Sequence, residues 1–170
     1  FEVEAYLLLA LPRSLGGVGF CDIELNVEVM LSTSARAIVG KSRVYIDILL
    51  SSPDGRRQVA IECQGKASHG RAGDGLRDAD RMTALQAMGY DVLLLTHRQI
   101  SDEDRFRAIV KAVCRMLDAE YRDKSSDEQR AETLLRSELF VDWTKLGVID
   151  GKMPVRHKTA QSWTAAVLSE

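Results

Sequence analysis

Two runs of aliphatic and β-branched residues, 43–51 and 58–64, flank the sequence Ser51-Ser-Pro-Asp-Gly-Arg56. In such a sequence proline fixes φ, aspartate hydrogen-bonds to nearby backbone, and glycine accepts a positive φ. The pattern is therefore typical of a tight turn between two antiparallel strands. We expect a β-hairpin here, and the chain must contain a β-sheet.

The hairpin brings two acidic residues together. A four-residue turn over 52–55 or over 53–56 places Asp47 and Glu62 on the same face, because both registers pair an odd position with an even one. In the second register they are direct cross-strand partners, with Cβ atoms ~4.5–5.5 Å apart. A one-residue bulge would break this pairing.

Two carboxylates at that separation repel each other unless a cation lies between them or one is protonated. Both also lie within apolar strand sequences, where an unpaired charge is costly. One explanation is a structural salt bridge to an arginine, such as Arg43 or Arg81. The other is a site in which Asp47, Glu62 and a backbone carbonyl hold Mg²⁺.

The rest of the chain alternates between strand and helix patterns. Residues 21–31 alternate apolar and polar positions and predict a strand, as does the apolar run 91–96. Helices are expected over 1–11, 74–88, from Ser101 and from Ser126, with a last one near 159–168, whereas 32–42 reads as a connection of uncertain form. This order predicts an α/β or α+β fold with a mixed sheet, a central hairpin and flanking helices. We expect a core domain over 1–122 and a helical C-terminal extension over 123–170, packed on or beside it.

The acidic pair and the residues after it resemble the PD-(D/E)XK nuclease superfamily, which has the restriction-endonuclease-like fold. The succession that carries the resemblance is Glu62-Cys-Gln-Gly65, His69, Asp78-x-x-Arg81, Leu85, Gly89-Tyr90 and Val92-Leu-Leu94. It is similar to small nuclease domains related to very-short-patch-repair endonucleases, and it covers about residues 43–120. The resemblance implies a restriction-endonuclease-like core and metal-dependent hydrolysis of phosphodiester bonds.

The resemblance also implies roles for individual residues. Asp47 and Glu62 would bind Mg²⁺ or Mn²⁺, with the Cys63 carbonyl as a third ligand. Gln64 occupies the position of the usual lysine, and it can orient a water molecule but supplies no charge. His69 matches a family histidine, for which a general base, a phosphate contact and a loop residue without a role all remain open.

Four further residues are accessory candidates. Glu4 matches a glutamate that related nucleases place on the first helix, although a solvated glutamate is the simpler explanation. Lys66 is a candidate substitute for the missing lysine. Asp78 and Arg81 lie three residues apart on a predicted helix, where they can pair with each other and orient the site.

The net charge of −2 hides an uneven distribution along the chain. Residues 36–81 carry nine basic and six acidic side chains, whereas 1–35 carry one and five. The central segment is therefore a candidate surface for DNA, the expected partner. Its proposed contacts are Arg43, Arg56, Arg57, Arg71 and Arg77.

The sequence therefore predicts a metal-dependent endonuclease, with a catalytically inactive nucleic-acid or protein binding module as the alternative. Its longest apolar stretch, Tyr6–Leu11, is far shorter than the ~20 residues of a membrane-spanning helix. Three widely spaced cysteines favour a reducing, cytoplasmic location over a disulfide framework. Because the chain opens at Phe1, we expect it to be cut from a longer polypeptide or processed, and a homodimer or further domains remain open as partners.

Overall fold

The computed structural model describes residues 1–64 and 74–141, with only the backbone of 74–77. The chain divides into two units, Phe1–Leu139 and Phe140–Glu170. The helix expected near 159–168 lies outside the described residues. No helix in the described ranges is long and apolar enough to cross a membrane.

The first unit is an α+β fold built on one four-stranded mixed sheet. The strands are β1 (Ile23–Met30), β2 (Arg43–Ser51), β3 (Gln58–Gln64) and β4 (Asp91–Thr96). The helices are α1 (Glu2–Ala10), the 3₁₀ helix η1 (Arg13–Leu15), α2 (Thr33–Val39), α3 (Asp74–Ala87), α4 (His97–Ser101), α5 (Glu103–Met116) and α6 (Ser126–Leu139). The sheet order is β1-β2-β3-β4, antiparallel except for the parallel pair β3–β4. The predicted fold class, with its central hairpin and helical C-terminal part, is confirmed.

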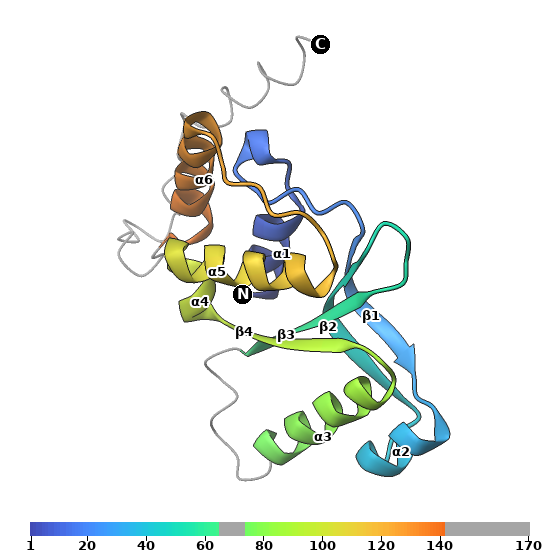
Figure 1. Ribbon diagram of the computed structural model, residues 1–170. Helices are drawn as coiled ribbons and strands as arrows, with labels where there is room; N and C mark the ends of the chain where they lie inside the picture. The colour runs from blue at the N-terminus through green and yellow to red at the C-terminus, as the bar shows by residue number, and fades with distance from the viewer. Residues whose placement is uncertain (65–73, 142–170) are drawn as a thin grey trace, which may run out of the picture. The chain divides into compact units, whose positions relative to one another are not determined.

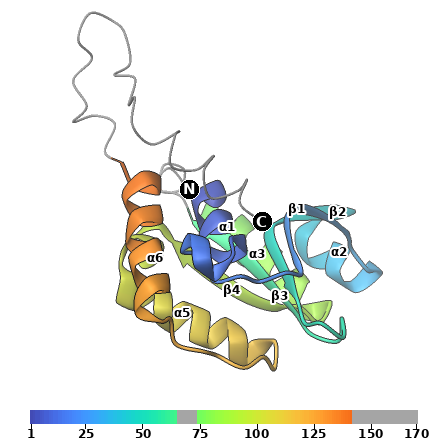
Figure 2. The ribbon, with the colours of Figure 1, turned by 90° about the horizontal axis from the view of Figure 1, so that it is seen from above.

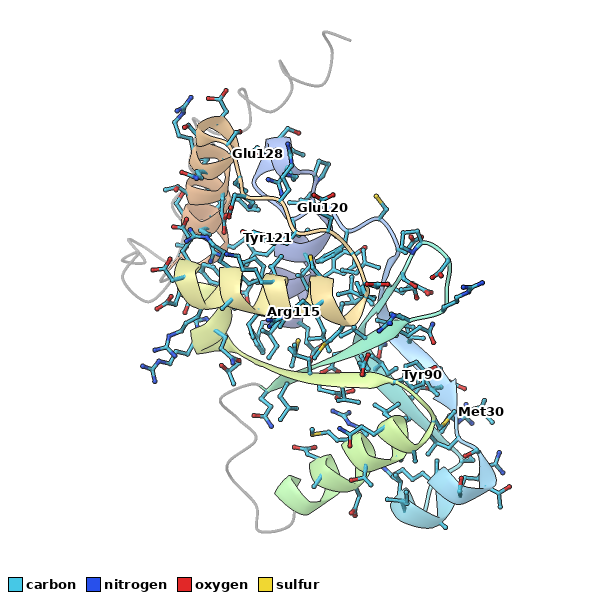
Figure 3. All side chains as sticks on the ribbon, in the orientation of Figure 1. Met30, Tyr90, Arg115, Glu120, Tyr121 and Glu128 are labelled. Atoms are coloured by element: carbon cyan, nitrogen blue, oxygen red, sulfur yellow. The ribbon has the colours of Figure 1, made fainter. Side chains whose placement is uncertain are left out.

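Helices cover the sheet on both faces. Figure 1 shows α1, α4, α5 and α6 on one side of the sheet and α2 and α3 on the other. In the view from above, α1 lies over the strands, with α5 and α6 beside it (Figure 2). Helices α2 and α3 pack against each other, and Tyr90, just after α3, packs against the apolar cluster on this side (Figure 3). Met30, at the end of the edge strand β1, is exposed (Figure 3).

The hairpin between β2 and β3 adopts the second of the two registers expected from the sequence. Backbone hydrogen bonds join Ser52 N–H to the Arg57 carbonyl at 2.9 Å and Gly55 N–H to the Ser52 carbonyl at 2.8 Å. Gly55 has a φ of 68°, which favours glycine. The turn therefore comprises residues 53–56, and the β2–β3 ladder pairs Ile48 with Ile61.

Strand β2 changes the phase of its side chains at Asp47. The β1–β2 ladder passes over Asn26 and Asp47, although it pairs the residues on both sides of them. Asn26 has a φ of 54°, outside the range of extended strands. Ile46 and Leu49 share one buried cluster, although strict alternation would place them on opposite faces. The backbone is therefore distorted where the first predicted acidic residue lies.

Two short helices were not expected. Helix α2 replaces the connection over 32–42; Ser32 Oγ accepts a hydrogen bond from Ala35 N–H at 3.3 Å, and Gly40 ends the helix at a φ of 71°. Helix α4 begins at a capping box formed by Thr96 and Gln99. Both caps are recognisable in the sequence, but each helix has only one or two turns, too few for a clear period.

Helix α6 is an integral part of the first unit, because it packs tightly against the segment after α1. A Cβ atom on Gly16 would lie 2.5 Å from the Ala131 carbonyl oxygen. Lys124 Nζ and Arg136 Nε each lie 2.7 Å from the carboxylate of Glu132, whose side chain is buried. The domain boundary predicted after residue 122 lies a few residues before α6, and α6 belongs to the first unit.

Candidate functional site

Strands β2 and β3, together with α1, α3 and β4, surround a cavity of about 230 Å³. Its lining residues come from five separate elements: Glu2, Asp47, Glu62, Cys63, Gln64, Asp78, Arg81, Met82 and Leu94. The two acidic residues of the predicted hairpin therefore line the same cavity. So do four other candidates predicted from the sequence, Cys63, Gln64, Asp78 and Arg81.

Asp47 is held by the backbone of the neighbouring strand. Its Oδ2 accepts a hydrogen bond from the Cys63 N–H at 2.7 Å. The pairing of β2 with β3 ends at Ile48 and Ile61, one position before Asp47 and Glu62 would face each other. The Asp47 carboxylate therefore accepts a backbone hydrogen bond that a strand carbonyl would otherwise accept. Asp47 is half-buried, and this bond fixes its carboxylate at the cavity wall.

Glu62 is the most deeply buried charged residue of the site, with 2% of its surface exposed. Its Oε2 accepts a hydrogen bond from Nη2 of Arg81, and the two groups form an ion pair. Its Oε1 is buried and has no hydrogen-bond partner among the described residues, and the same is true of Arg81 Nε. The pair therefore satisfies only part of the hydrogen-bonding capacity of either group.

Burial raises the pKa of Glu62 from 4.5 to about 7. The positive charge of Arg81 acts in the opposite direction, and the negative charges of Asp47 and Asp78 raise the pKa further. We attribute the rise in the pKa of Glu62 to desolvation, because the carboxyl group is almost completely removed from water. The charged form of Glu62 is thus poorly stabilised by the protein alone.

The cavity has an excess of acidic groups. Four carboxyl side chains line it, those of Glu2, Asp47, Glu62 and Asp78, whereas Arg81 is the one cation among the lining residues that the structure describes.

Burial, followed by the charge of Asp47, raises the pKa of the Cys63 thiol to about 12. The thiol is therefore protonated at neutral pH in the metal-free protein.

The cavity offers oxygen donors of the kind that a hard divalent cation binds. Oxygen atoms of carboxylates are the ligands that Mg²⁺ prefers, and the buried, unpartnered Oε1 of Glu62 lacks a positive partner of its own. Within residues 1–64 and 74–141, no three His, Cys, Asp or Glu side chains converge closely enough to form a metal site. Arg81 is paired with Glu62 instead, as the salt-bridge explanation anticipated.

The glutamate of α1 that lines the cavity is Glu2, not the predicted Glu4. Glu2 lines the cavity, whereas Glu4 lies 2.9 Å from the amino group of Phe1. Both residues are in the first turn of α1, and the sequence offers no signal that distinguishes them. Which of the two glutamates lines the cavity depends on how α1 packs over the sheet.

The predicted nucleic-acid contacts are spread out. Arg43 pairs with Glu28 at 3.0 Å. Arg56 and Arg57 lie at the hairpin turn, and Arg57 is five residues from Glu62, roughly 17 Å along the strand. Lys66, His69 and Arg71 lie outside the described residues, as does the side chain of Arg77.

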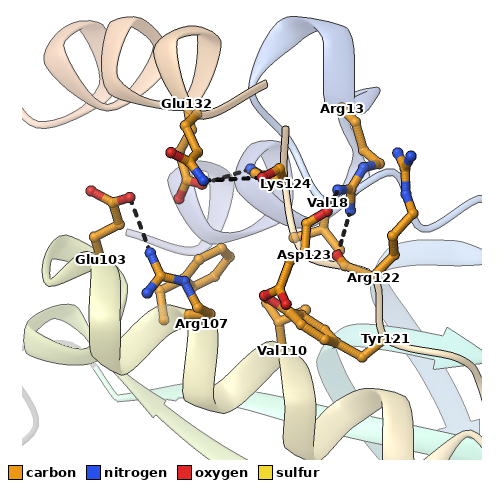
Figure 4. Close-up of a pocket in the computed structure, with 12 residues that line it drawn as sticks. Arg13, Val18, Glu103, Arg107, Val110, Tyr121, Arg122, Asp123, Lys124 and Glu132 are labelled. Atoms are coloured by element: carbon orange, nitrogen blue, oxygen red, sulfur yellow. Dashed lines mark hydrogen bonds and ion pairs between the residues drawn. The ribbon is translucent and has the colours of Figure 1, made fainter. Parts of the chain in front are cut away.

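A second cavity, of about 200 Å³, lies between α5, α6 and the segment that joins them. Figure 4 shows that its charged side chains contact each other: Lys124 reaches Glu132, and Arg107 reaches Glu103. Arg13 is likewise paired with Glu128, at 2.9 Å. The Arg13 and Lys124 pairs join α6 to η1 and to the segment before α6, whereas the Arg107 pair lies within α5.

No protein-family model matches this chain, and searches of curated proteins and of solved structures found no match. A function therefore has to be inferred from the chemistry of the site.

Proposed function

We propose that this chain is a divalent-metal-dependent endonuclease of the PD-(D/E)XK type, which hydrolyses phosphodiester bonds in DNA. The observation that carries the proposal is the pair of carboxylates, Asp47 and Glu62, on adjacent strands of one acidic cavity. The buried and unpartnered Oε1 of Glu62 supports it, because such an oxygen is costly unless a cation compensates it.

Asp47 and Glu62 would hold Mg²⁺ or Mn²⁺, with the Cys63 carbonyl as a further oxygen donor at the cavity wall. The bound ion would polarise a phosphoryl oxygen and lower the pKa of a water molecule. Gln64 orients that water by hydrogen bonding, because its amide both donates and accepts. The hydrogen bond from Cys63 N–H keeps Asp47 in place for this role.

The excess negative charge of the cavity also bears on substrate binding. A phosphate group would be repelled by the four carboxyl groups that line it unless a cation offsets them. DNA binding at this cavity is therefore expected to require the metal. The surface arginines Arg56 and Arg57 would contact the phosphate backbone of the DNA at a distance from the reaction centre.

An inactive binding module is the second candidate. Two observations favour it: Gln64 stands where a lysine is usual, and Arg81 already pairs with Glu62. In that case the ion pair would be purely structural. DNA or a protein would then bind without metal and without cleavage.

Incubation of supercoiled plasmid and single-stranded DNA with the protein and Mg²⁺ or Mn²⁺ separates the two candidates. We expect cleavage by the wild type, and its loss in EDTA, in Asp47→Asn and in Glu62→Gln. Asp104→Asn is the matched control, because this exposed carboxylate of α5 lies outside the cavity. Cleavage that persists in Asp47→Asn, or no cleavage by the folded wild type with either metal, would contradict the proposal.

A further inference from the structure

We propose that Arg81 is a displaceable counterion: it neutralises Glu62 while the site is metal-free, and a divalent cation releases it to contact the substrate phosphate. The first part concerns metal binding alone, and the second rests on the proposed function. Both parts depend on the hydrogen bonds that Arg81 and Glu62 leave unmade between them.

A structural arginine–carboxylate pair is usually bidentate, with two parallel N–H···O bonds. Here one bond joins Arg81 Nη2 to Glu62 Oε2, while Glu62 Oε1 and Arg81 Nε are both buried without a partner among the described residues. A buried pair that is only partly satisfied gains little over its desolvation cost. The pairing is thus poorly suited to a purely structural role, and a second cation can compete for Glu62.

The position of Arg81 allows it to leave. It is on α3, and 32% of its side chain is exposed, whereas Glu62 is buried on β3. Asp78 lies one helical turn earlier and lines the same cavity, so it offers the guanidinium a nearby alternative partner. The arginine can therefore turn toward solvent without unfolding the helix that carries it.

A divalent cation at Asp47 and Glu62 would repel the guanidinium electrostatically and take over its partner. The released Arg81 would remain at the cavity wall beside Asp78, with the donors that Glu62 no longer occupies available to a ligand. Guanidinium groups bind phosphate through paired donors, so a scissile phosphate is a suitable new acceptor. Arg81 would then supply the positive charge that Gln64 lacks.

The test measures Mn²⁺ affinity by isothermal titration calorimetry for the wild type, Arg81→Met and Arg81→Lys. Loss of the competing charge-assisted bond should strengthen Mn²⁺ binding about tenfold in Arg81→Met. Arg81→Lys should strengthen it less, because an ammonium group still competes for Glu62. Arg107→Met is the matched control, since it removes an exposed arginine paired with Glu103 on α5.

Thermal unfolding and cleavage complete the experiment. We expect Arg81→Met to melt below the wild type in EDTA, to gain more from Mn²⁺, and to cleave DNA more slowly at saturating Mn²⁺. Unchanged or weaker Mn²⁺ binding in both folded Arg81 variants would overturn the counterion role. Equal cleavage rates at saturating metal would overturn the phosphate role.

The proposed function can fail separately from this inference. If the wild type binds Mn²⁺ but cleaves no DNA, the nuclease proposal fails, while tighter Mn²⁺ binding by Arg81→Met still supports the counterion. If the wild type cleaves DNA and Arg81→Met does not bind Mn²⁺ more tightly, the nuclease stands and the counterion fails.

Discussion

Replacing Glu62 with glutamine should change how the stability of the metal-free protein depends on pH. The pKa of Glu62 is raised in the folded state because the carboxyl group is buried. The folded protein therefore binds this proton more tightly than the unfolded chain does. The resulting stability is fully present below about pH 4.5 and is lost as the pH rises toward 7.

The size of the effect follows from the two pKa values. The pKa of Glu62 rises from 4.5 to about 7. At about 1.36 kcal/mol per pH unit, this difference corresponds to about 3 kcal/mol of unfolding free energy. Glutamine has nearly the same shape and does not titrate, so the variant should lack this loss.

Urea unfolding in EDTA at several pH values between 4 and 8 measures the effect. The unfolding free energy of Glu62→Gln minus that of the wild type should increase by about 3 kcal/mol across this range. Asp104→Asn is the control, because 87% of that side chain is exposed and water already solvates its charge. Parallel pH curves for Glu62→Gln and the wild type would refute the assignment of Glu62 as a carboxyl group that burial destabilises.

Four further substitutions test the packing and capping of the first unit, and all can be measured by urea unfolding. Gly17→Ala should destabilise the protein by about 2 kcal/mol or more, because its Cβ would lie 1.9 Å from the Leu11 carbonyl oxygen. Gly40→Ala, in open space at a φ of 71°, should cost about 1 kcal/mol. Equal losses in the two variants would contradict the close packing of the segment after α1. Glu132→Gln should cost about 3 kcal/mol because it leaves Lys124 and Arg136 near a neutral group, and a loss below about 1 kcal/mol would show that this network is not buried. Ser32→Ala should cost about 1 kcal/mol by removing the N-cap of α2, and no loss would indicate that the cap does not form.

The sequence predicts the hairpin well because its turn chemistry is local. Pro53 fixes its own φ, Asp54 hydrogen-bonds to nearby backbone, and Gly55 accepts a positive φ whatever surrounds them, and the turn forms at these residues. Helix α2 was missed because seven residues give too few turns for a clear apolar period, although Ser32 and Gly40 cap it.

The site could be predicted only in part. The parity of the hairpin places Asp47 and Glu62 together, but the distortion at Asp47 depends on the positive φ of Asn26 in a neighbouring strand. The contact of Arg81 with Glu62 depends on how α3 packs against the sheet, so the sequence left the salt bridge and the metal as open alternatives. The position of Glu2 at the cavity depends similarly on how α1 packs over the sheet.

The measurement that tests the central claim most directly is a crystal structure of the full chain soaked in Mn²⁺, with anomalous scattering used to locate the ion. We predict an anomalous peak about 2 Å from carboxylate oxygens of both Asp47 and Glu62, with Arg81 withdrawn from Glu62. An intact Arg81–Glu62 pair without an anomalous peak in this cavity, at a Mn²⁺ concentration that supports cleavage, would contradict the account.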